Sequence, residues 1–288
     1  MADSAMSLPA SVTVAEGRGG LPVVRVASPT ATGEIHLDGA TVTGWTPTGA
    51  DEVLFCSAAS RFEAGEPIRG GVPLCAPWFG GGPKNDKTPA HGFFRTRRWE
   101  LASASEDEGA VALTFELGGD LPADLTARYV VTMGETLDMA LTITAGAEDL
   151  PLEAALHTYL RVGDIRQVGL EGLDGCRYVD KAPGGRAVNA QSGTVRFTRE
   201  TDRVYAHEGT VVVEDAGAGR RITVAKEGSA STIVWNPWEG KAARLGDLGD
   251  EEWTQMVCVE SGNVLRQAMT LAAGQSHTLR QRLSVARA

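Results

Sequence analysis

The sequence contains no long apolar run. Nowhere in its 288 residues does a stretch approach the ~20 apolar residues that a membrane helix requires. The opening stretch "MADSAMSLPA" lacks a basic region followed by an apolar one, so we expect no secretory signal there. We expect residues 1–10 to be a frayed terminus, and we expect the protein to have no membrane partner.

Cysteine is scarce, and its spacing forms no recognisable pattern. The four cysteines are Cys56, Cys75, Cys176 and Cys258. None belongs to a CxxC pair, and no histidine lies at zinc-finger spacing from them, so the pattern predicts neither a metal site nor a disulfide framework. Reduced, mostly buried thiols are the simpler interpretation, and they are typical of a cytoplasmic protein.

Basic residues are outnumbered, and common nucleotide and hydrolase motifs are missing. The chain has 27 Lys and Arg against 37 Asp and Glu, for a net charge of −10. Because nucleic-acid binding needs clustered Lys and Arg to neutralise phosphates, we expect no nucleic-acid partner. The sequence also has no GxxxxGK[ST] loop, no GxSxG elbow, no HExxH helix and no dinucleotide fingerprint.

Helical periodicity is nearly absent, and alternating periodicity dominates. "GAVALTFEL", "LTARYVVTM" and "ETLDMALTITA" each place apolar residues at every second position, which predicts strands with one buried face. Residues 133–135 predict a hairpin turn between the last two. The longest helical candidate, "GDEEWTQM", has only one or two turns, which is marginal.

The C-terminal half has the same alternation. "GTVVVEDAGAGRRITVAKEGSASTIVWNPW" predicts three strands with turns at 215–219 and 227–229. "AMTLAAGQSHTLRQRLSV" predicts a final hairpin around Gly274. We therefore predict an all-β fold, a β-sandwich of two large antiparallel sheets, as a single domain over residues 1–288.

One long segment, residues 66–92, is rich in Gly and Pro and is predicted to be a functional loop or disordered. It lies in a basic island, because residues 61–100 contain seven basic and four acidic residues, 7 − 4 = +3. A local positive field of this kind suits a small anionic ligand. Arg69 stands between Ile68 and two glycines, and "HGFFRTRRWEL" contributes His91 and Arg95. Arginine offers two-pronged recognition of a phosphate or carboxylate, although solvated surface arginines are the ordinary alternative.

Two titratable residues lie in apolar, strand-like segments. His157 belongs to "LHTYLRVGDI", and Glu260 ends the apolar run of "MVCVESGNV". The ordinary interpretation of His157 is a core histidine bonded to a backbone carbonyl, and that of Glu260 is a strand-end glutamate turned to water. The functional interpretation of His157 is a proton donor held on a rigid strand, and that of Glu260 is a general base whose pKa is raised by burial.

Two further motifs supply candidate ligand contacts. "WNPW" contains Trp235, whose ring can pack on a sugar face, and Asn236, whose amide can bind hydroxyls; core packing and a turn are the alternatives. "ETDRVY" contains Asp202, which is either a surface ion-pair partner of Arg203 or a carboxylate that holds a sugar hydroxyl.

Together these motifs resemble a known family. "IRGGVPLCAPWFG", "HGFFR", "LHTYLRVGDI", "FTRETDRVY", "WNPW" and "VCVESGN" occur in this order. The set is similar to the hexose-6-phosphate mutarotase (glucose-6-phosphate 1-epimerase) branch of the aldose 1-epimerase family, over most of the chain from about Gly33 onward. The resemblance implies a galactose mutarotase-like β-supersandwich, in agreement with the alternating pattern. It departs from the family at Ala76, where an aromatic residue is expected, and at Phe94, where a small one is usual.

The resemblance also implies roles for the candidates. His157 becomes the general acid and Glu260 the general base. Arg69 and Arg95 are implied to be a phosphate-binding pair, and His91 a group near the ring oxygen or the anomeric carbon. Asp202 is implied to be a substrate-binding carboxylate, and Trp235 and Asn236 are implied to lie near the pocket.

The implied reaction is the interconversion of α and β anomers of an aldohexose 6-phosphate by acid/base ring opening. It needs no metal and no organic cofactor. A histidine pKa near ~6.5 would leave a useful fraction of imidazolium at neutral pH. The alternatives are an aldose 1-epimerase acting on unphosphorylated sugars and a catalytically silent carbohydrate-binding protein. We expect a monomer or weak oligomer in the cytoplasm whose partner is a small sugar phosphate.

Overall fold

Alternating sequence becomes alternating burial in the computed structural model, which describes residues 7–185 and 188–288. In β8 (Leu125–Met133) and β9 (Leu137–Ala145) every second side chain is buried, and Met133 pairs with Leu137 across the predicted turn. The hairpin at residues 133–135 is therefore confirmed. Of the terminus predicted to fray, residues 1–6 lie outside the described part of the chain.

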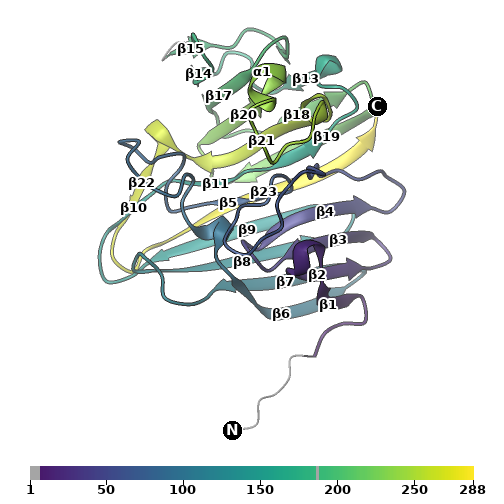
Figure 1. Ribbon diagram of the computed structural model, residues 1–288, viewed down its shortest axis with the longest axis vertical. Helices are drawn as coiled ribbons and strands as arrows, with labels where there is room; N and C mark the ends of the chain where they lie inside the picture. The colour runs from purple at the N-terminus through teal and green to yellow at the C-terminus, as the bar shows by residue number, and fades with distance from the viewer. Residues whose placement is uncertain (1–6, 186–187) are drawn as a thin grey trace.

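Two large antiparallel sheets form the architecture, as predicted (Figure 1). The nine-stranded sheet has, in spatial order, β16 (Val195–Arg196), β13 (Val168–Glu171), β18 (Val211–Asp215), β19 (Arg220–Glu227), β23 (Ser276–Arg287), β9, β8, β7 (Ala110–Leu117) and β6 (Trp99–Asp107). The eight-stranded sheet runs β15 (Asn189–Ala190), β14 (Arg177–Asp180), β17 (Thr201–Ala206), β20 (Ser231–Asn236), β21 (Met256–Asn263), β11 (Ala154–Leu156) and β5 (Leu74–Cys75), with β12 (Tyr159–Arg161) also on β21.

Smaller elements complete the fold. A four-stranded sheet of β1 (Val12–Glu16), β2 (Pro22–Ala27), β3 (Ala31–His36) and β4 (Thr41–Pro47) packs on the β8–β9 hairpin, where the Trp45 indole donates to the Gly134 carbonyl at 3.1 Å. The other short elements are β10 (Leu150–Leu152) paired with β22 (Met269–Leu271), the helix α1 (Trp238–Ala242), and 3-10 turns at Arg18–Gly20, Phe94–Thr96, Ile165–Gln167, Glu252–Gln255 and Leu265–Gln267. No helix among the described residues is long and apolar enough to span a bilayer.

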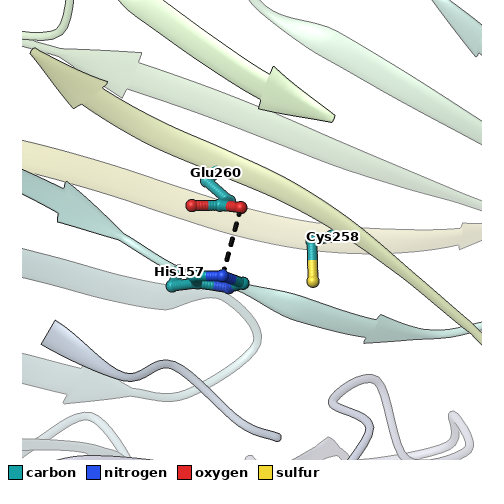
Figure 2. Close-up of side chains that lie close together, drawn as sticks. All are labelled: His157, Cys258 and Glu260. Carbon is teal, nitrogen blue, oxygen red and sulfur yellow. Dashed lines mark ion pairs between the residues drawn. The ribbon is translucent and has the colours of Figure 1, made fainter. Parts of the chain in front are cut away.

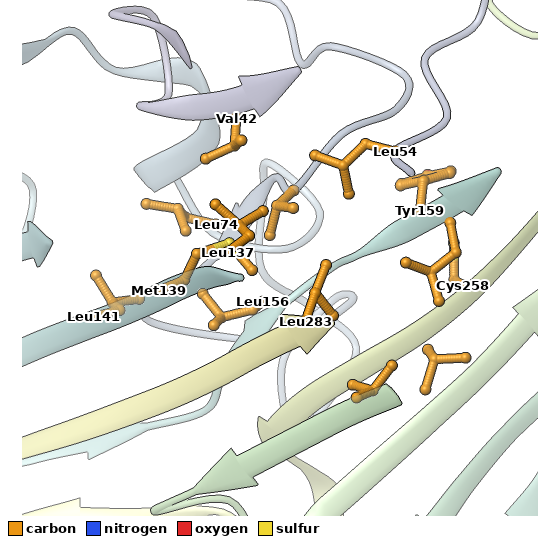
Figure 3. Close-up of a cluster of buried hydrophobic side chains, with 14 of the residues drawn as sticks. Val42, Leu54, Leu74, Leu137, Met139, Leu141, Leu156, Tyr159, Cys258 and Leu283 are labelled. Atoms are coloured by element: carbon orange, nitrogen blue, oxygen red, sulfur yellow. The ribbon is translucent and has the colours of Figure 1, made fainter. Parts of the chain in front are cut away.

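The core lies between the sheets. Figure 3 shows Leu156 of β11 close to Met139 of β9 and Leu283 of β23. Polar links also join the sheets: the buried Gln281 of β23 accepts a hydrogen bond from Thr158 and donates to Ser261 of β21. The proposal of a single domain rests on this continuous interior.

One strand prediction is correct and another is wrong. The segment 211–236 forms three strands as predicted, although β19 and β20 belong to different sheets and the chain crosses between them. The predicted final hairpin around Gly274 does not form, because β22 pairs with β10. The following strand β23 pairs with β9 along residues 276–283 and with β19 along residues 280–287.

Core packing makes a matched prediction for two valines. Val131 of β8 is fully buried, whereas Val14 of β1 is 48% exposed. Val131→Ala removes two buried methyl groups and leaves a cavity, so it should lower the free energy of unfolding by about 2 kcal/mol. Val14→Ala should change it by less than about 0.5 kcal/mol. Urea titration measures both, and equal losses would contradict the placement of the core.

Candidate active site

Strand register brings His157 and Glu260 together. Leu156 pairs with Ser261 and Tyr159 pairs with Cys258, so the same register places His157 opposite Glu260. The two side chains share a face, and His157 Nε2 lies 3.4 Å from Glu260 Oε1 (Figure 2). Residues 103 positions apart in the chain (260 − 157) are thus cross-strand neighbours.

His157 does not lie within a strand, contrary to the expectation. It occupies the two-residue gap between β11 and β12, where its backbone N–H donates to the Pro73 carbonyl at 3.0 Å. The Thr158 carbonyl accepts from Val259 N–H at 3.1 Å, so the register continues through the gap. The His157 ring therefore points as it would from a strand, and the bond between Thr158 and Val259 continues the pairing with β21 across the gap.

A cavity of about 190 Å³ lies over this face of the eight-stranded sheet. His157 is 8% exposed and Glu260 1% exposed. A larger open hollow of about 740 Å³ lies elsewhere, between the loop 47–51 and the C-terminal end of β23, and includes neither residue. The cavity over the sheet is lined by Arg69, Phe79, His91, His157, Lys181, Asp202, Ile233, Trp235, Lys241, Leu245 and Glu260.

Burial controls the proton of the His157–Glu260 pair. It raises the pKa of Glu260 well above its usual value, with the Asp202 carboxylate adding to the rise. Burial also lowers the pKa of His157 well below 6.5, reinforced by His91, Arg95 and Arg69. Although 3.4 Å would suit an ion pair, both shifts favour the neutral form, with the proton on Glu260 and the imidazole neutral. The expected pKa near 6.5 for His157 is wrong, because burial removes the water that would hydrate an imidazolium.

His91 is a neutral donor beside the pair. Its ring centroid lies 5.7 Å from that of His157, and its Nδ1 accepts from the Gly80 N–H at 3.4 Å. That bond requires the proton on Nε2. Burial, with Arg95 as the next cause, lowers the pKa of His91 to about 3. The residue therefore offers an N–H donor and no charge at neutral pH.

Arg69 lies at the pocket wall and is linked to His157 through Tyr159. Its guanidinium donates to the Tyr159 hydroxyl at 3.0 Å and pairs with Asp247 at 3.0 Å. The Tyr159 ring stacks on His157, with centroids 4.9 Å apart and planes 15° apart. Arg95 does not line the cavity; it donates to the Ala90 carbonyl at 2.9 Å. The buried Nε atoms of both arginines have no hydrogen-bond partner.

The other predicted residues separate into two groups. Trp235 and Asp202 line the pocket, in a cross-strand row with Cys258. Asn236 does not line it, and its amide donates instead to the carbonyls of Trp253 and Met256 at 2.8 and 2.9 Å. The predicted sugar contact of Asn236 is therefore wrong. Consecutive residues of a strand face opposite sides, so Asn236 points away from the pocket that Trp235 lines, and its amide binds backbone carbonyls.

Two lysines that the sequence analysis missed also line the pocket. Lys181 lies 3.7 Å and Lys241 3.9 Å from Asp202, and Lys241 also pairs with Glu200 at 3.0 Å. Lys241 follows "WNPW" by three residues on α1, a proximity that could have singled it out. Lys181 comes directly after β14, and only the pairing of β14 with β17 brings it to Asp202.

The two departures from the family pattern lie outside the pocket lining. Ala76 is fully buried, and its carbonyl accepts from Phe93 N–H at 3.0 Å. Phe94 is also fully buried and packs edge-on against Trp99, with centroids 5.7 Å apart. Both residues therefore belong to the hydrophobic core and not to the pocket.

The protonation of Glu260 makes a stability prediction. In the unfolded chain a glutamate ionises above about pH 4.5, whereas folded Glu260 holds its proton to higher pH, so its contribution destabilises the fold as pH rises from there. Glu260→Gln removes this penalty. The variant should gain stability over the wild type at pH 8 and gain less at pH 5, measured by urea unfolding. Glu239→Gln, on the exposed side of α1, is the control with no such difference. A gain that is the same at both pH values would contradict the assignment.

Comparison with known proteins identifies the family of the chain. The family described as aldose 1-epimerase matches residues 22–284. An Escherichia coli K12 protein named "Putative glucose-6-phosphate 1-epimerase" is 36% identical over 248 residues, covering 84% of this chain and 83% of its own length. A protein of the same name from Cenchrus ciliaris is 32% identical over 259 residues, covering 84% and 78%.

A solved structure extends the likeness to the fold. The crystal structure of a Salmonella typhimurium protein, titled "putative mutarotase (YeaD)", superposes with a TM-score of 0.89 at 32% identity, covering 99% of this chain and 96% of that one. The predicted sandwich and the predicted family are both confirmed. The chain belongs to the aldose 1-epimerase family, isomerases that interconvert the anomers of sugars.

Proposed function

We propose that this protein interconverts the α and β anomers of an aldohexose 6-phosphate, with Glu260 as general base and His157 as general acid. One observation carries the proposal: a buried imidazole–carboxyl pair, 3.4 Å apart, opens into a pocket lined by three cationic side chains. The names of the Escherichia coli and Cenchrus ciliaris relatives support the choice of a glucose 6-phosphate.

The chemistry follows from one acid and one base. Glu260 takes the proton of the C1 hydroxyl while His157 gives a proton to the ring oxygen, and the bond between C1 and that oxygen breaks. The open-chain aldehyde rotates about C1–C2, and the same transfers in reverse close the ring on the other face. His157 Nδ1 and Glu260 Oε2 are buried without a hydrogen-bond partner, so both groups have capacity for the sugar.

The pair must change tautomer before it reacts. Its resting form has the proton on Glu260, whereas the reaction needs a carboxylate and an imidazolium, which have the same total charge. Arg69 and Arg95 oppose the imidazolium and are among the causes of its low pKa. A phosphate dianion held by Arg69 would offset that field, so binding of the remote phosphate favours the reactive tautomer.

Cations around the pocket outnumber carboxylates. Three basic residues line the pocket together with two acidic ones, a formal balance of 3 − 2 = +1, in a protein of net charge −10. Local reversal of the overall charge is what an anionic sugar requires. The residues counted are Arg69, Lys181, Lys241, Asp202 and Glu260.

The remaining pocket residues suit a pyranose. Trp235 offers an aromatic face, and the His91 Nε2–H offers a neutral donor near the reacting pair. Asp202, held by two lysines, offers carboxylate oxygens to sugar hydroxyls. We assign no role here to a metal or organic cofactor.

Loss of the base should abolish the reaction. Glu260→Gln should slow anomerisation by roughly 10²–10⁴-fold because the amide accepts no proton, while the sugar phosphate still binds. Exchange NMR on anomerically pure glucose 6-phosphate measures the rate, and calorimetry measures binding. Full activity in the variant would rule out Glu260 as the base. A wild-type protein that leaves the spontaneous rate unchanged would instead indicate a silent carbohydrate-binding protein.

Loss of Arg69 should affect phosphorylated sugar selectively. Arg69→Ala should raise KM for glucose 6-phosphate by roughly 10–100-fold, the value of a charge-assisted pair of hydrogen bonds, and raise KM for free glucose far less. Arg97→Ala, an exposed arginine of the same basic island, is the matched control and should change neither. Equal effects of Arg69→Ala on both sugars would mean that the phosphate site is wrongly placed. A wild-type kcat/KM for glucose as high as that for glucose 6-phosphate would instead indicate an aldose 1-epimerase for unphosphorylated sugars.

A further inference from the structure

The reaction leaves one side chain of the acid/base cluster unused, the thiol of Cys258. It lies on β21 two residues before Glu260 and directly across from Tyr159, so it shares the face of the reacting pair. One donor atom each from His157, Cys258 and Glu260 lies within 4.8 Å of the other two. Figure 2 shows the sulfur directed to the same side of the strand as the carboxylate.

These three donors match the preferences of a borderline-soft divalent cation. Imidazole nitrogen, thiolate sulfur and carboxylate oxygen are the protein ligands of Zn²⁺, and three of them with a fourth position open is a common arrangement. Thiolate selects Zn²⁺ over Mg²⁺ and Ca²⁺, which prefer oxygen alone. A tetrahedral ion needs ligand atoms about 3.5 Å apart, so the donor atoms, which lie within 4.8 Å of one another, would move closer together on binding.

The open position would face the sugar pocket, because His157 and Glu260 both line it. Cys258 is fully buried beneath them. An ion there would occupy the lone pairs of the base and of the acid, with release of the thiol proton and of the proton that the pair shares. It would therefore exclude proton transfer and compete with the substrate.

We propose that His157, Cys258 and Glu260 form a binding site for Zn²⁺, and that the ion is a reversible inhibitor competitive with the sugar. The site goes beyond the proposed function, since it concerns a ligand that the reaction does not use. The spacing of the cysteines along the chain predicts no metal site; the register of β21 against residues 154–161 assembles one.

A binding experiment tests the site without reference to catalysis. Co²⁺ added to the full chain should give the sulfur-to-cobalt charge-transfer absorption and the visible bands of a tetrahedral thiolate site, and Zn²⁺ should displace it. Cys258→Ala and Cys258→Ser should lose the charge-transfer band and weaken Zn²⁺ binding at least ~10-fold. Cys176→Ser, which alters a thiol outside this cluster, is the control and should retain both.

Kinetics provide the second readout. Zn²⁺ should raise the apparent KM without changing kcat, a chelator should restore the rate, and Mg²⁺ should have no effect. Inhibition that persists unchanged in both Cys258 variants, or a spectrum without thiolate bands, would overturn the proposal and leave the epimerase function untouched. A wild-type protein that binds Co²⁺ through Cys258 but turns over no sugar would instead count against the proposed function alone.

Discussion

The antiparallel pairing of β21 with residues 154–161 is the constraint on which the site depends. That register sets His157 opposite Glu260 and Tyr159 opposite Cys258, and a shift of one residue would turn the whole set toward the core. The link from Thr158 through Gln281 to Ser261 ties the same segment to the nine-stranded sheet. Packing between the sheets therefore holds the geometry of the acid/base pair.

Burial sets the pKa values of His157 and Glu260, and it also makes their charged forms costly. Burial keeps the pair neutral, which limits its reactivity in the empty pocket. The cations at the wall oppose the imidazolium further, so the charge of the ligand becomes part of the chemistry. In this view the phosphate does more than position the sugar, because it offsets the field of Arg69 that opposes the imidazolium form of His157.

Much of the fold could be predicted because alternation is a local property. In residues 125–133 the alternation of apolar and polar residues marks the buried face of the strand, and the end of that alternation marks the turn at residues 133–135. The final hairpin prediction was wrong because β22 pairs with β10, which is more than a hundred residues away in the chain, and local patterns do not encode such pairing. Asn236 was misassigned because adjacent residues in "WNPW" face opposite sides of β20.

The sequence by itself determined the strand content, the family motifs, the basic island and the candidates His157, Glu260 and Arg69. Each of these can be recognised from residues that are close together in the chain. Only the tertiary structure decided the protonation of the pair, the recruitment of Lys181 and Lys241, and the proximity of Cys258. These properties depend on distances between segments far apart in the chain and on the exclusion of water. No local pattern encodes either, since both arise when strands pair and sheets pack.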